Sequence, residues 1–74
     1  MKEILDLHGI KHEDVGSLLD SFIWENMKRK VTGVSVITGN SPEMKRIVSD
    51  IAKEYGFEVV DSIGNSASVN INLI

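Results

Sequence analysis

An amphipathic helix in the second half of the chain limits the fold more than any other feature. Its apolar residues recur with the period of an α-helix, and they are Met44, Ile47, Val48, Ile51, Ala52 and Tyr55. Ser41 and Pro42 suit the start of this helix, because serine caps a free amide and proline needs no hydrogen bond there. Gly56 suits its end as a left-handed cap. One apolar face must be buried, so the chain needs a second layer.

The other segments predict that layer. Four of them have the β-branched content or the alternation of strands: 4–8, 33–38, 57–63 and 67–74. Residues 12–29 form a further helix, and residues 64–66 form a hairpin turn. Right-handed crossovers then make the first three strands largely parallel and the last two antiparallel. We predict an α/β two-layer sandwich with the order β-α-β-α-β-β, in which two helices pack on a four-stranded mixed sheet. It forms a single domain over residues 1–74.

The helix over 12–29 has one large apolar residue outside its core stripe. The stripe consists of Val15, Leu18, Leu19, Phe22 and Ile23. Trp24 falls on the opposite side of the helix. An exposed tryptophan suits a partner-binding or self-association surface, but Trp24 can equally pack against the preceding loop or a second copy. The sequence leaves both interpretations open.

Composition and charge narrow the classes of function. Eight Lys plus Arg stand against eleven Asp plus Glu, giving a net charge of −3. Nucleic-acid affinity comes largely from basic residues, so we expect any such binding to be weak and local. The absence of cysteine excludes disulfides, thiolate catalysis and cysteine-bound zinc. No apolar run approaches the roughly 20 residues of a membrane span, which predicts a soluble cytoplasmic protein without membrane contact. The start at Met1 predicts that no N-terminal extension wraps a substrate.

Two loops are candidates for a binding site, because ligands of open α/β sheets gather beyond the carboxyl ends of strands. The first loop contains His8 and Gly9, and the second is Thr38–Ser41. If the first two strands are neighbours, these loops meet at one edge. The second loop leads into a helix start, whose free amides and dipole favour an anion. Lys45 and Arg46 in the first turn of this helix interact unfavourably with the positive end of its dipole, and a phosphate bound nearby would offset that repulsion. The candidate nucleic-acid-binding residues are Gly9, Thr38, Gly39, Asn40, Ser41, Lys45 and Arg46.

A family resemblance rests on the same two loops. Residues 5–9 read Leu-Asp-Leu-His-Gly, which is similar to the Leu-Asp-x-His-Gly motif of the Smr (small MutS-related) domain. The resemblance extends over nearly the whole chain to the terminal Ser-Val-Asn-Ile-Asn-Leu strand. The second motif of the family is His-Gly-x-Gly at the end of strand two. This chain has Thr38, Gly39, Asn40 and Ser41 there, so the histidine and the last glycine are replaced.

The resemblance implies the fold of the carboxy-terminal domain of translation initiation factor three. It also implies a role on nucleic acid, either binding or endonucleolytic nicking, with Asp6 and His8 as the catalytic residues. A histidine beside a carboxylate can serve as general acid or base, and the carboxylate can orient the ring or hold a divalent metal ion. Thr38 cannot titrate near neutral pH. His12, across the turn at the start of the first helix, is a candidate stand-in for the second histidine. The Asp-x-His pair can equally serve as turn scaffolding without catalysis. Three functions remain open: a stand-alone domain that binds DNA or RNA phosphates, a nicking endonuclease, and a protein-interaction module.

Overall fold

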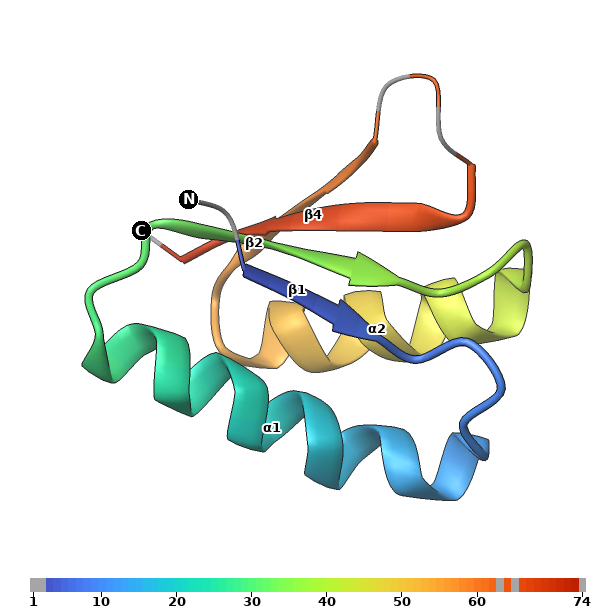
Figure 1. Ribbon diagram of the computed structural model, residues 1–74, viewed down its shortest axis with the longest axis horizontal. Coiled ribbons are helices and arrows are strands. Elements are labelled where there is room, and N and C mark those ends of the chain that lie inside the picture. Colours follow the sequence, from blue (N-terminus) through green and yellow to red (C-terminus); the bar gives the residue numbers. More distant parts are fainter. Residues whose placement is uncertain (1–2, 63, 65, 74) are drawn as a thin grey trace.

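The computed structural model describes residues 3–62, 64 and 66–73 and has the predicted order of elements (Figure 1). They are β1 (Glu3–Asp6), α1 (His12–Lys28), β2 (Gly33–Ile37), α2 (Pro42–Glu54), β3 (Glu58–Asp61) and β4 (Ser68–Asn72). The strands are shorter than the sequence predicts. Residues 63 and 74 of the predicted strands, and residue 65 of the predicted turn, lie outside the described residues. The predicted α/β two-layer class is confirmed.

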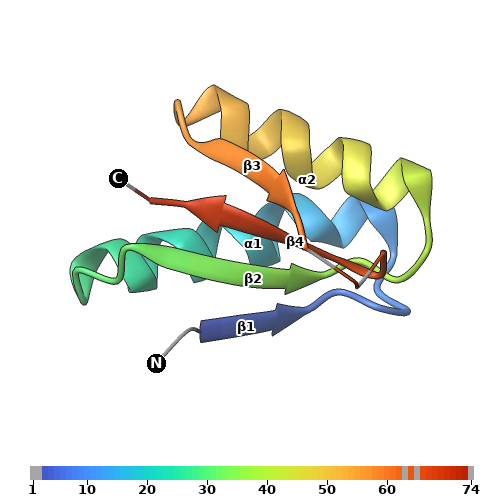
Figure 2. The ribbon, with the colours of Figure 1, turned by 90° about the horizontal axis from the view of Figure 1, so that it is seen from above.

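The sheet has the strand order β1-β2-β4-β3. β1 pairs with β2 in parallel, and β4 pairs antiparallel with both β2 and β3. The first three strands therefore run in one direction and the last two form an antiparallel pair, as predicted. β1, β2 and β3 end at the same side of the sheet, where both helices begin (Figure 2). We call this side the carboxyl edge.

The core lies between the sheet and the two helices, which cover the same face (Figure 1). α1 contributes Val15, Leu19 and Ile23 to it, all fully buried. The sequence placed Leu18 in this stripe as well, but Leu18 is 41% exposed, so that prediction was wrong. The helix contacts both the sheet and α2. Because Leu19 and Ile23 are buried where α1 meets the sheet and α2, the side chain of Leu18 beside them faces solvent.

The predicted ends of α2 are confirmed. The Ser41 hydroxyl accepts a hydrogen bond from the Met44 amide at 3.1 Å, and Pro42 is the first helical residue. At the other end Gly56 has φ +82°, and the Phe57 amide donates to the Ala52 carbonyl at 3.0 Å. The Ser41 cap fixes the end of the loop that precedes α2 and therefore helps to position the candidate site, whereas the Gly56 cap ends the helix at its far end. Neither helix of the described residues is long and apolar enough to span a membrane.

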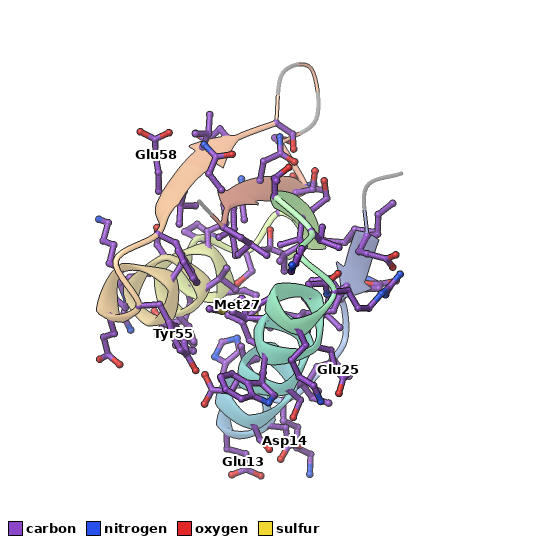
Figure 3. All side chains as sticks on the ribbon, turned by 90° about the vertical axis from the view of Figure 1, so that its left-hand side faces the viewer. Glu13, Asp14, Glu25, Met27, Tyr55 and Glu58 are labelled. Carbon is purple, nitrogen blue, oxygen red and sulfur yellow. The ribbon has the colours of Figure 1, made fainter. Side chains whose placement is uncertain are left out.

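The second face of the sheet carries no helix. Glu58 projects from β3 on this side, away from both helices (Figure 3). Near the middle of the face, the Ser35 hydroxyl donates to Oδ1 of Asn70 at 2.6 Å. The predicted alternation of β4 is confirmed, since Val69 and Ile71 are buried and Asn72 is exposed.

Candidate nucleic-acid interface

The loop after β1 is a tight turn held by Asp6. Its Oδ1 accepts a hydrogen bond from the backbone amide of His8 at 2.9 Å. Gly9 has φ +80°, and the Ile10 amide returns to the Leu7 carbonyl at 3.0 Å. Leu7 is fully buried and anchors the turn, whereas the His8 side chain is exposed. Asp6 thus holds the backbone that presents the imidazole, and its observed hydrogen bond does not go to the ring.

The loop after β2 is fastened to the start of β4. The amides of Thr38 and Gly39 donate to the Ala67 carbonyl at 2.8 and 3.0 Å. Thr38 is only 3% exposed, and its hydroxyl shares its proton between the carbonyls of Gly39 (2.8 Å) and Ala67 (3.3 Å). Thr38 therefore supports the loop from within. The amide of Gly39 is already engaged, so an anion here would be bound by other donors.

The two loops meet at the carboxyl edge. Gly39 has φ +69°, and a methyl group at its Cα would lie 3.3 Å from Cδ2 of the His8 ring. The imidazole of His8 therefore rests against the backbone of Gly39 while remaining exposed to solvent. This is the juxtaposition that the sequence predicts if β1 and β2 are neighbours, which they are.

The two cations at the start of α2 have different surroundings. Arg46 forms ion pairs with Glu43 at 2.6 Å and Asp50 at 3.2 Å. The hydrogen bond from Arg46 and its charge lower the pKa of Glu43, with a smaller contribution from the charge of His12. In return, Glu43 raises the pKa of Arg46. Among the described residues Lys45 forms no ion pair. Lys45 is therefore the cation that remains available to an anionic ligand.

A divalent metal ion finds little support at this site. Within the part of the chain that the structure describes, no three His, Asp or Glu side chains are grouped so that they could hold a metal ion. Asp6 and His8 alone offer two ligands, and one carboxylate oxygen of Asp6 is already engaged by the backbone. We therefore derive no chemical step through a metal ion.

The loop between β3 and β4 supplies residues that the sequence did not point to. The Ser66 hydroxyl donates to Oδ1 of Asn40 at 2.8 Å, and the carbonyl of Ala67 accepts from the β2–α2 loop. Both contacts arise because β4 inserts beside β2. Only the strand order could have identified them, and the sequence pattern does not specify that order.

Trp24 lies away from the carboxyl edge. Its side chain is 60% exposed, as predicted, and it stands twelve residues into α1, about 18 Å along the helix axis. Met27 and Tyr55 are also partly exposed, at 40% and 44%; Met27 is on the side of α1 that faces α2 (Figure 3). Any partner of Trp24 would bind at a surface separate from the two loops.

Comparison with protein families matches the Smr domain to residues 5–66, which is most of the chain and includes both loops. No curated protein and no solved structure matches significantly. The Smr domain is associated with nucleic-acid binding and with activity of the nicking-endonuclease type. The extent of the match shows that the chain belongs to the Smr domain family.

Proposed function

We propose that this domain binds the phosphate backbone of nucleic acid at the loops after β1 and β2. The observation that carries the proposal is the contact between the exposed His8 ring and Gly39 at the carboxyl edge. There a nitrogen-bearing side chain, a glycine backbone and the starts of two helices come together. The proposed contact residues are Gly9, Gly39, Asn40, Ser41, Lys45 and Arg46, with His8 at the centre, and the buried Thr38 supports the loop from within.

The electrostatics support local and weak binding. Helix starts attract anions through their dipoles and free amides, and both helices begin at this edge. At α2, Pro42 has no amide proton and the Met44 amide is bonded to Ser41, so the attraction there comes mainly from the dipole. Acidic residues in the first turns oppose that attraction, namely Glu13 and Asp14 on α1 and Glu43 on α2. Glu13 and Asp14 project away from the sheet (Figure 3), and Glu43 is paired with Arg46. The repulsion is therefore reduced where the two loops meet.

The test is a titration of isotopically labelled protein with single-stranded RNA and with duplex DNA at low salt. We expect amide shifts at Gly9 and over residues 39–45, which decrease as salt rises because counterion release drives the association. His8→Ala should weaken binding, and Lys28→Gln at the far end of α1 is the control. Unchanged amides with both nucleic acids would refute the proposal and favour a protein-interaction module that uses Trp24.

Nicking endonuclease activity is the second candidate, because His8 is exposed and stands where a phosphodiester would lie. In this function His8 acts as general acid or base, and Asp6 sets its position through the backbone. The assay is incubation of purified protein with supercoiled plasmid and Mg²⁺ or Mn²⁺. Nicking that His8→Ala abolishes and His12→Ala preserves is the expected result. Intact plasmid under all conditions would eliminate this function and leave binding alone.

A further inference from the structure

A pocket lies at the carboxyl edge beyond the ends of β3 and β4. Its volume is ≈ 390 Å³, and it is lined by Lys45, Asp61, Ser62, Gly64, Ser66 and Ser68. Lys45 comes from α2, and the others come from β3, β4 and the segment between them. None of these residues belongs to the loops after β1 and β2, and Lys45 alone among them is also a proposed contact residue.

The lining is rich in hydrogen-bond donors. Ser68 donates to the Ser62 oxygen at 2.9 Å, and Ser66 donates to Asn40 at 2.8 Å. Since the Ser62 oxygen accepts from Ser68, its own proton remains for a ligand. Lys45 is half-buried and forms no ion pair with any described residue. An ammonium group and a hydroxyl donor in one pocket match the acceptor oxygens of a phosphate.

The pocket is linked to the loop after β2 by a hydrogen bond. Asn40 belongs to the loop after β2 and bonds to Ser66 on the rim of the pocket. From β1 to β3 the sheet has three strand spacings, or about 14 Å. Successive phosphates of one strand are about 3.4 Å apart along a duplex axis. A nucleic-acid strand that crosses from His8 to Lys45 therefore presents more than one phosphate to this edge.

We infer that this pocket is a second phosphate subsite, in which Lys45 and Ser62 bind a phosphate of the same strand that contacts the His8–Gly39 loops. The inference rests on the proposed function. It adds the path of the bound nucleic-acid strand along the carboxyl edge, from β1 toward β3 and β4. Asp61 is the one anion in the lining. Repulsion between the Asp61 carboxylate and a bound phosphate limits the affinity of the subsite.

The experiment compares Lys45→Gln with Lys53→Gln in binding a short single-stranded DNA. Both variants remove one positive charge from α2, and Lys53 lies eight residues further along, about 12 Å away. A cation near the positive end of a helix dipole is unfavourable, so Lys45→Gln should not destabilise α2 through the dipole. Weaker binding by this variant therefore reports the lost contact with DNA. We expect Lys45→Gln to weaken binding about tenfold and to reduce the slope of log affinity against log salt by about 0.7. We expect Lys53→Gln to have little effect.

Asp61→Asn gives the opposite test. Removing its charge should tighten DNA binding several-fold, and an unchanged or weaker affinity counts against the subsite. Because Lys45 is also a proposed contact residue of the two loops, the subsite further requires that DNA shifts the amides of Ser62 and Ser68. Equal affinities of Lys45→Gln and Lys53→Gln would refute the subsite and remove Lys45 from the proposed contact residues, whereas DNA still shifting Gly9 and Asn40 would preserve the proposed binding at the two loops. No DNA-induced shifts in the wild-type protein would refute both. Inorganic phosphate is titrated in parallel; shifts of Ser62 and Ser68 with phosphate but not with DNA would identify a free-anion site and overturn the assignment to a strand.

Discussion

Replacing Gly39 by alanine tests the contact on which the site depends. The residue has φ +69°, where an L-amino acid is strained by about 1–2 kcal/mol. About 0.4–1 kcal/mol of this cost is offset, because alanine lowers the conformational entropy of the unfolded chain. The new methyl group would also lie 3.3 Å from Cδ2 of His8. His8 is exposed, so its ring can turn away at a cost of about 1 kcal/mol or less.

Gly56→Ala, beyond the far end of α2, is the matched control. Gly56 has φ +82°, and a methyl group there meets no atom within 4 Å outside its two chain neighbours. Both variants should therefore lose about 1 kcal/mol of stability from backbone strain. Only Gly39→Ala should displace the His8 imidazole, and it should weaken nucleic-acid binding more than Gly56→Ala does.

Stability is measured by urea unfolding followed by circular dichroism, and the ring position by the NMR shifts of the His8 side-chain protons. The expected result is a similar stability loss in both variants with a ring-proton change in Gly39→Ala alone. Identical His8 spectra in the two variants would refute the contact between the loops.

Three further predictions concern the surroundings of the site. Thr38→Val removes the hydroxyl that bonds to Gly39 and Ala67, and we expect a loss of about 1 kcal/mol in urea unfolding; unchanged stability would contradict this role. Arg46→Gln should raise the lowered pKa of Glu43 toward its ordinary value. The ionised Glu43 carboxylate contributes stability that is present above the ordinary pKa and is lost as the pH falls through the lowered one. This contribution should shrink in the variant, and acid unfolding measures it. Tyr55 donates to Asp20 at 2.9 Å, which raises the tyrosine pKa; this contribution to stability is complete below pH 10 and is lost as the pH rises through the raised value. Asp20→Asn should bring the tyrosinate absorbance transition to lower pH, and an unmoved transition would show that the bond is absent.

The elements of the fold could be predicted because each has a local physical signal. The α2 stripe, its serine cap and its glycine end are short-range features. Met44, Val48 and Ala52 are buried as their spacing requires, whereas Tyr55, placed in the same stripe, is 44% exposed. Leu18 was misplaced because a helical stripe defines a face only to within one or two positions. The neighbours of α1 then decide which of those positions is buried.

The meeting of the two loops was predictable on one condition, and their internal contacts were not predictable. Parallel strands β1 and β2 bring their loops together; the sequence implied the parallel direction and left open whether the two strands are neighbours. The insertion of β4 between β2 and β3 depends on long-range pairing that no local pattern encodes. The contacts of Ala67 with Thr38 and of Ser66 with Asn40 depend on it.

The altered second motif is best understood from the surroundings of Thr38. Its counterpart in the family motif is a histidine, yet Thr38 is 3% exposed, and its hydroxyl donates to the carbonyl oxygens of Gly39 and of Ala67, the residue before β4. The small hydroxyl side chain reaches both oxygens from a buried position. The substitution therefore removes a titratable group and at the same time fastens the loop to the sheet. Because His8 is left as the one imidazole in the two loops, we propose phosphate binding at this edge ahead of proton transfer to and from a phosphate.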